Sequence, residues 1–133
     1  MALASVGGGY QVGDGNKNEL ILNVQNAPGA TTATSVTLAV SDLVNGMYTS
    51  TNASAVAITL PTAALTDASL VNAKVDSSFD LIVINLGSAS GAVTMTAGTG
   101  WTLVGSATVA ISTSARYRAR KTADAAWTLY RIA

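Results

Sequence analysis

Apolar side chains recur at every second position in several short segments of this 133-residue chain, and this spacing limits the possible fold more than any other feature. Successive side chains of a β-strand point to opposite faces, so each such segment has one apolar and one polar face. The segments are rich in Val and Thr and are bounded by Gly, Asn, Ser or Pro, as strands are. The alternating positions are Val36, Leu38 and Val40; Val56, Ile58 and Leu60; Val93 and Met95; and Val109 and Ile111. The pattern predicts an all-β protein.

Two further segments indicate the centre and the end of the sheet structure. Residues 79–86 (FDLIVINL) are apolar on both faces, which is typical of a central strand covered on two sides. Residues 115–121 and 127–133 flank a short polar turn at Asp124 and are predicted to form a terminal hairpin. With about nine or ten strand candidates at close spacing, we expect a β-sandwich or a β-barrel, formed by one domain over residues 19–133.

Two parts of the chain depart from the strand pattern. Residues 61–72 begin with Pro-Thr and place apolar side chains near helical spacing, which predicts one short helix near residues 62–72. Residues 1–18 are rich in glycine and predict a flexible N-terminal arm. No internal repeat of roughly 20–50 residues is evident, so we expect neither a solenoid nor a propeller.

Charged residues make up only 11% of the chain, against about 25% in ordinary soluble domains. A surface so poor in charge favours contacts with other subunits or partner proteins. Neither a secretory signal nor an apolar stretch of about 18 residues is present, so we expect a soluble protein made in the cytoplasm, with no membrane partner.

The chain has no His and no Cys. This removes the Ser-His-Asp and Cys-His nucleophiles and the common zinc sites, and we expect no enzymatic activity, no cofactor and no metal. Asp76 and Asp80 lie near a strand entrance, where aspartates commonly form turns rather than a catalytic pair. Residues 14–19 resemble the start of a calcium loop, but Glu19 stands where glycine is required, which favours an ordinary polar turn.

The one positive cluster is the segment 116–121, RYRARK. On a strand, Arg116, Arg118 and Arg120 share one face, and Tyr117 lies on the other. With Lys121, these residues are our candidates for a partner or subunit interface. The alternatives are a solvated face that discourages aggregation, and contact with nucleic acid, which the zero net charge disfavours.

The acidic residues of the chain lie mostly before residue 90, and the basic residues mostly after it. The two sets could pair within one fold, between neighbouring subunits or with a charged partner, or simply mix evenly on folding.

The aromatic residues allow two interpretations, a buried core or an exposed binding surface. Trp101 and Trp127 are expected to anchor the core, but if exposed they could form a sugar-binding surface with tyrosines.

From about Leu60 onwards, five segments share one style of strand and turn: residues 60–65 (LPTAAL), 78–85 (SFDLIVIN), 97–105 (AGTGWTLVG), 113–118 (TSARYR) and 127–132 (WTLYRI). In these segments the chain resembles small virion proteins of tailed bacteriophages and related marine viruses. Such proteins are capsid decoration (cement) proteins or fibre knobs, commonly trimeric β-sandwiches and often jelly-roll-like, so the resemblance implies an antiparallel, jelly-roll-like sandwich. The resemblance implies a homotrimer that binds the major capsid protein on the outer surface of an assembled virion and stabilises the shell. It implies no nucleic-acid partner.

Two expectations depend on this resemblance. The N-terminal arm would contact the capsid through Tyr10, Gln11 and Val12, because a glycine-rich segment can order on a partner surface. The alternative function is a phage fibre tip or a carbohydrate-binding β-sandwich.

Overall fold

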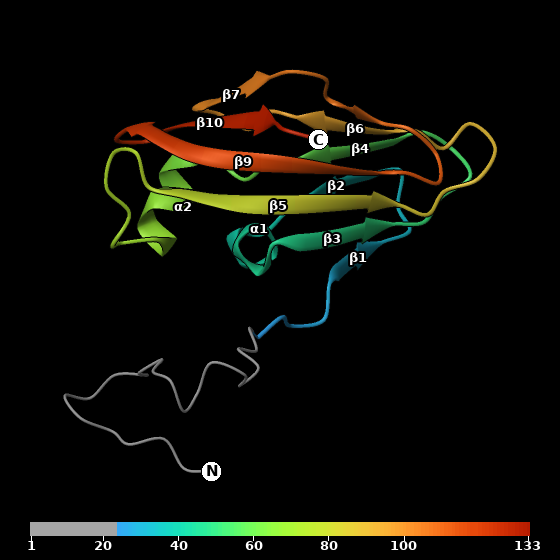
Figure 1. Cartoon of the computed structure of the whole chain (residues 1–133), viewed down its shortest axis with the longest axis horizontal. Helices are drawn as coiled ribbons and strands as arrows, with labels where there is room; N and C mark the ends of the chain where they lie inside the picture. Colours follow the sequence, from blue (N-terminus) through green and yellow to red (C-terminus); the bar gives the residue numbers. More distant parts are fainter. Residues whose placement is uncertain (1–23) are drawn as a thin grey trace, which may run out of the picture.

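The computed structural model describes residues 24–133, which contain ten strands and two helices (Figure 1). In chain order these are β1 (Gly29–Thr31), β2 (Ser35–Thr37), α1 (Val40–Asn45), β3 (Met47–Ser50), β4 (Val56–Thr59), α2 (Ala63–Ser69), β5 (Ser78–Asn85), β6 (Val93–Thr96), β7 (Trp101–Val104), β8 (Thr108–Val109), β9 (Ser114–Ala123) and β10 (Ala126–Arg131). The expected arm over residues 1–18 lies outside the described residues.

The strands form two sheets that pack face to face. The larger sheet has the order β1-β3-β5-β9-β10-β7, and the smaller has the order β2-β4-β6-β8. Successive strands alternate between the sheets from β1 to β8, so the chain winds around the core instead of completing one sheet before the other. The two-sheet, strand-rich expectation is confirmed.

The expected antiparallel jelly roll is not what residues 24–133 form. Strands β1, β3 and β5 pair in parallel, as do β2, β4 and β6, and β7 pairs in parallel with β10. Antiparallel pairing occurs at β5–β9, β9–β10 and β6–β8. Alternation in the sequence predicts that a segment is a strand, but it does not predict which strand lies beside it or whether the two are parallel. Parallel neighbours require a crossover connection, and here the crossover passes through the opposite sheet.

The winding of β1 to β6 resembles three coils of a solenoid, a class of fold that we did not expect. Gly29 pairs with Tyr48, and Tyr48 pairs with Val83, so the second coil is almost twice as long as the first. The helices α1 and α2 occupy return connections of different length. Unequal coils leave no repeat of fixed period in the sequence, which is the signal on which the prediction depended.

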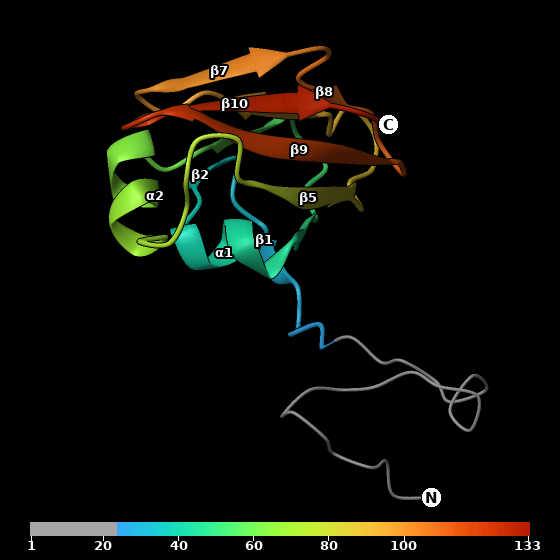
Figure 2. The ribbon, with the colours of Figure 1, turned by 60° about the vertical axis from the view of Figure 1, so that its left-hand side comes forward.

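Both helices lie at one end of the two sheets (Figure 2). The predicted helix near residues 62–72 is α2, whose first turn is capped by Thr62: its Oγ1 accepts a 3.2 Å hydrogen bond from the backbone N–H of Leu65. Helix α1 was missed, because Val40 continues the alternation of Val36 and Leu38. The local signals for α1 are Asp42, whose carboxylate accepts the N–H of Ala39, and Gly46, which ends the helix with φ +81°.

The core lies between the sheets and is built from their inward-facing positions. The predicted apolar faces of β4 and β6 are confirmed: Val56, Ile58, Leu60, Val93 and Met95 are all buried. Strand β5 is central, as expected, but it is not covered on both sides. Leu81 and Val83 are fully buried, whereas Ile82 and Ile84, on the other face, are half-buried.

The predicted terminal hairpin is confirmed as β9 and β10, which pair from Ala126 opposite Ala123 to Arg131 opposite Tyr117. It extends the larger sheet beyond β5. The outer face of this sheet is not covered by either helix (Figures 1 and 2).

Candidate functional site

A row of arginines runs along the outer face of the larger sheet. On β9, Arg116, Arg118 and Arg120 point outward, while Ala115, Tyr117 and Ala119 are buried, as the period of two predicts. The side chains of the three arginines are 51%, 49% and 43% exposed in that order. The strand therefore presents three half-exposed guanidinium groups on one uncovered face.

Asp80 holds two of these arginines. It lies on β5, directly opposite Arg118 in the sheet register. Its Oδ1 accepts a 2.7 Å hydrogen bond from Arg118 Nε, and its Oδ2 accepts bonds from Arg118 Nη2 at 3.1 Å and Arg116 Nε at 3.0 Å. Arg116 Nη2 also donates to Oδ2. The hydrogen bonds from Arg118 and then Arg116 lower the pKa of Asp80 to about 2, so its carboxylate is ionised in neutral solution.

Asp76 holds the third arginine from the turn before β5. Its Oδ1 accepts a 2.9 Å bond from Arg120 Nε and a second bond from Nη2. Asp76 has φ +73°, a left-handed conformation that aspartate tolerates, and its backbone N–H donates to the carbonyl of Lys121. The turn and the end of β9 are thereby joined at both the side-chain and the backbone level.

These pairs answer one question that the sequence left open. At these sites the early acidic residues and the late basic residues pair within one fold. The two aspartates also do not face one another as a catalytic pair, since each is bound to arginine. An ionised carboxylate with a pKa of about 2 is a poor proton donor near neutrality.

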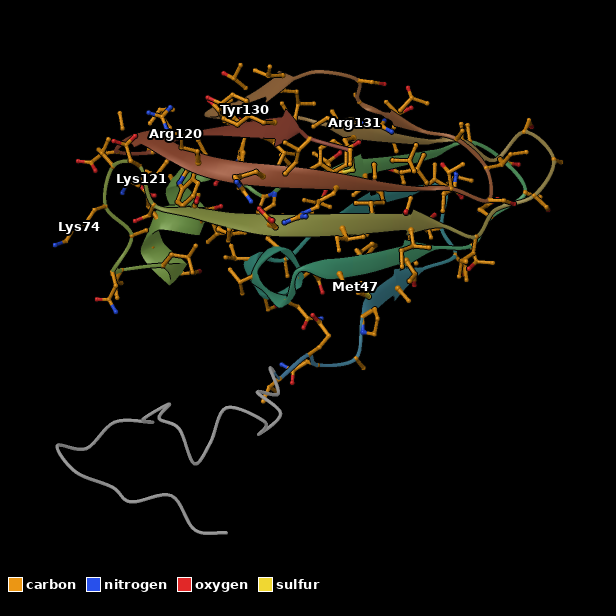
Figure 3. All side chains as sticks on the ribbon, viewed as in Figure 1. Met47, Lys74, Arg120, Lys121, Tyr130 and Arg131 are labelled. Carbon is orange, nitrogen blue, oxygen red and sulfur yellow. The ribbon has the colours of Figure 1, made fainter. Side chains whose placement is uncertain are left out.

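We define the arginine face as Arg116, Arg118, Arg120, Asp76 and Asp80 with the apolar positions on either side. Three guanidinium groups and two carboxylates give it a net charge of +1. Ile82 and Ile84 of β5 lie on one side of the row, and Tyr130 of β10 and Val104 of β7 on the other, with Val104 exposed. Figure 3 shows Arg120 and Tyr130 at this sheet and Met47 on β3.

Two of the residues grouped with the arginines lie elsewhere. Tyr117 and Lys121 are on the inner side of β9 and are 2% and 6% exposed, so neither can contribute to a contact on the arginine face. Lys121 Nζ lies 3.1 Å from Asp67 Oδ2 and 3.4 Å from Asp124 Oδ1. The hydrogen bond to Asp67 contributes most to raising the pKa of Lys121. The period of two places Tyr117 and Lys121 on the face opposite the three arginines, but both were grouped with the arginines because they belong to the same segment, residues 116–121.

The aromatic side chains do not form an exposed platform on the described residues. Trp101 and Trp127 are 7% and 1% exposed, and their rings stack with centroids 5.7 Å apart. Tyr48 and Tyr117 are buried as well. The expectation that the tryptophans anchor the core is confirmed. The sugar-binding alternative required an exposed tryptophan, and neither Trp101 nor Trp127 is exposed.

A hollow of about 320 Å³ lies beside this aromatic cluster and has no signal in the sequence. It is lined by the end of α2, the following loop, Phe79 and Trp127. The ring of Phe79 lies 5.6 Å from that of Trp127 between centroids. An apolar hollow of this size can hold a side chain of a partner or a small apolar molecule.

The remaining predicted contacts, Tyr10, Gln11 and Val12, lie outside the described residues. Among residues 24–133, no three acidic, His or Cys side chains form a group that could hold a metal ion. In the same range, neither helix has the length and apolar character needed to cross a membrane.

Together, the fold and the site define a class: a β-protein of two mixed sheets, with one uncovered sheet face that carries paired charges. Comparisons with protein-family models, with curated proteins and with solved structures find no match for this chain.

Proposed function

We propose that this chain is a structural protein of a virion, which decorates the outer surface of the assembled shell and stabilises it. The arginine face is the docking surface, and the major capsid protein is the partner. The observation that carries the proposal is the exposure of three ordered arginines on a sheet face that no other described part of the chain covers.

The ordered arginines retain hydrogen-bonding capacity toward a partner. The ion pairs with Asp80 use Nε and Nη2 of Arg116 and Arg118, which leaves Nη1 of each for another acceptor. A guanidinium group carries five donors in a rigid plane and suits carboxylates. Because Asp80 already fixes both side chains, less side-chain entropy is lost when a partner binds.

The partner of this face is a different protein with acidic side chains. Each of the five aspartates within residues 24–133 already contacts a donor of its own chain; these are Asp42, Asp67, Asp76, Asp80 and Asp124. A carboxylate from the described part of a second copy would therefore bind the arginines only in addition to a donor that it already contacts, and Asp124 is the one among these five whose side chain is fully exposed. A polyanion such as nucleic acid is disfavoured, because Asp76 and Asp80 reduce the charge of the face to +1.

The virion setting follows from the resemblance to phage decoration proteins, and the composition is consistent with it. A chain with only 11% charged residues suits a protein that works in contact with others. A shell also presents many identical sites, so an oligomer bound through several weak contacts gains occupancy through avidity. The resemblance implies three copies in that oligomer.

The test is a pelleting assay with shells of the virus that encodes the chain. The full-length protein should sediment with assembled shells and stay in solution with unassembled capsid subunits. Arg116→Gln together with Arg118→Gln should reduce shell binding by at least about tenfold, since each lost charge-assisted hydrogen bond costs about 1.5 kcal/mol or more.

The matched control is Lys74→Gln. Lys74 is an exposed cation on the loop before β5 and points away from the arginine row (Figure 3). The Lys74→Gln variant should bind shells as the unmodified chain does. The unfolding temperatures of the arginine variant and of Lys74→Gln establish that both are folded. Equal binding by the arginine variant and the control would exclude the arginine face, and no binding of the unmodified chain to shells would exclude the function.

A further inference from the structure

The two sheets end together at one edge of the molecule, in β1 and β2. Strand β1 is hydrogen-bonded to β3 alone and β2 to β4 alone, so each has one unpaired side (Figure 1). Both strands are three residues long. We call their unpaired sides the double edge.

The hydrogen-bonding groups of the double edge can be assigned from the register. The backbone carbonyl of Thr31 accepts from Thr51 N, and that of Thr34 accepts from Ala57 N. The backbone groups of Thr31 and Thr34 therefore point toward the neighbouring strand within their own sheet. Bonding direction alternates along a strand, and the backbone N–H and C=O groups of Ala30, Ser35 and Thr37 therefore point outward. All three residues are exposed.

The double edge lacks the charges by which sheet edges are usually protected. No charged residue occurs between Val24 and Ser41. Natural sheet edges are protected by Lys, inward charges, bulges, proline or very short strands. Here only the short length of β1 and β2 and Pro28, directly before β1, act in that way. Val36 of β2 packs against the core but is only half-buried, so the core itself is incompletely closed at this edge.

At the opposite edge of the smaller sheet, strand β8, the outward backbone groups are bonded to side chains of the same chain. On β8, Thr108 N donates to Ser106 Oγ at 3.3 Å, and Thr108 O accepts from Arg131 Nη1. Both outward groups of that residue are occupied by side chains of the same molecule, one of them charged. The double edge has no corresponding contacts at Ala30, Ser35 or Thr37 within the described residues.

The chain leading into β1 is fixed along α1. Gln25 Nε2 donates to the backbone carbonyl of Asn45 at 2.8 Å, and Asn45 Nδ2 donates to the carbonyl of Ala27 at 2.8 Å. These bonds tie residues 25–27 to the end of the helix. This stretch therefore does not cover the unpaired side of β1.

We propose that the double edge pairs with the same edge of a second copy, through a two-fold axis. Two identical edges can meet antiparallel with donors opposite acceptors, and neither edge strand contributes a charged residue to the contact. Asp42, whose carboxylate lies beside Gly29 of β1, is bonded to the N–H of Ala39 in its own chain. Pairing would extend both sheets across the contact and complete the burial of Val36. This contact is independent of the arginine face and of the partner proposed for it, and it gives an oligomer of two copies in place of the three that the resemblance implies.

The experiment measures mass against concentration by size-exclusion chromatography with light scattering, on the full-length protein. The unmodified chain should approach two copies as its concentration rises. Ala30→Lys together with Ser35→Lys places charges on both edge strands at exposed positions, and should raise the dissociation constant by more than about tenfold. Thr94→Lys is the matched control: it adds a charge at an exposed position of β6, an interior strand of the smaller sheet, and should leave the mass unchanged.

Amide hydrogen exchange identifies what covers the edge. The N–H groups of Ala30, Ser35 and Thr37 should become protected as the concentration rises and lose protection on dilution. Protection that does not vary with concentration would assign the edge to a segment of the same chain and overturn the proposal. A single copy at all concentrations, or three copies that the double variant leaves intact, would overturn it as well, while shell binding would remain a separate result.

Discussion

The indole Nε1 of Trp127 donates a 2.7 Å hydrogen bond to Oδ1 of Asp67. The other carboxylate oxygen, Oδ2, accepts a 2.7 Å bond from the N–H of Ala125 and lies 3.1 Å from Lys121 Nζ. One aspartate of α2 thus holds both strands of the terminal hairpin and the turn between them. Burial tends to raise the pKa of Asp67, but the hydrogen bonds from Ala125, Trp127 and Lys121 outweigh it, and the net pKa is lowered.

Asp67→Ala should lower the free energy of unfolding by about 1–3 kcal/mol, because it leaves the buried indole N–H of Trp127 without an acceptor. Asp124→Ala is the control: Asp124 also contacts Lys121, but its side chain is fully exposed, and its loss should cost no more than about 0.5 kcal/mol. Urea unfolding followed by tryptophan fluorescence measures both. Similar values for the two variants would show that the charge on Lys121, and not the indole bond, carries the stabilisation.

Asp80 should make stability depend on pH in acid. Its folded pKa of about 2 lies below the value of about 3.9 for an unfolded aspartate. The unfolded chain therefore binds more protons in this range, and the stabilisation is fully present above about pH 4 and lost as pH falls toward 2. Asp80→Asn should reduce the slope of the free energy of unfolding between pH 2 and 4 by less than one proton. Urea midpoints across this range measure the slope, and an unchanged slope would contradict the assignment.

Asn85→Ala should destabilise the fold by more than about 2 kcal/mol. Asn85 is 1% exposed; its Nδ2 donates to the carbonyls of Gly91 and Val109, and its Oδ1 accepts from Gly87 N. Asn85→Asp keeps the shape but replaces two donors with an acceptor, and should be at least as destabilising.

The control for Asn85 is Asn52→Ala. Asn52 makes two similar bonds, to Thr32 O and from Ser54 N, but both are exposed to water. Its loss should cost about 1 kcal/mol or less by thermal or urea unfolding. A cost as large as that of Asn85→Ala would show that burial does not decide the effect.

Gly100→Ala should cost several kcal/mol, and Gly105→Ala about 1–2 kcal/mol. Both glycines have left-handed φ, +84° and +93°. At Gly100 an added Cβ would lie 2.5 Å from the carbonyl oxygen of Ala125, whereas at Gly105 the nearest atom is Arg131 Cβ at 3.1 Å. The difference between the two unfolding free energies isolates the steric clash from the backbone strain, and equal values would contradict the packing at Gly100.

Local patterns predicted the elements and the direction of many side chains. The period of two placed Arg116 and Arg118 on one face and Tyr117 on the other, and Pro61-Thr62 marked the start of α2. The same rule failed at Val40, which begins α1 although it continues the alternation, because a run of three apolar positions is too short to separate a strand end from a helix start. Neither Asp67 nor Asn85 could be recognised, since their partners are about 60 and up to 24 residues away in the chain.

By itself, the sequence determined that this chain forms strands with one apolar face, ends in a C-terminal hairpin and places Arg116, Arg118 and Arg120 on one face of a strand. These properties depend on neighbouring residues and on burial, both of which a periodic pattern records. Only the tertiary structure decided that β1, β3 and β5 are parallel, that Asp76 and Asp80 bind the arginines, and that β1 and β2 end both sheets together. Strand pairing depends on how all the core side chains pack together, and no single segment of the sequence carries that information.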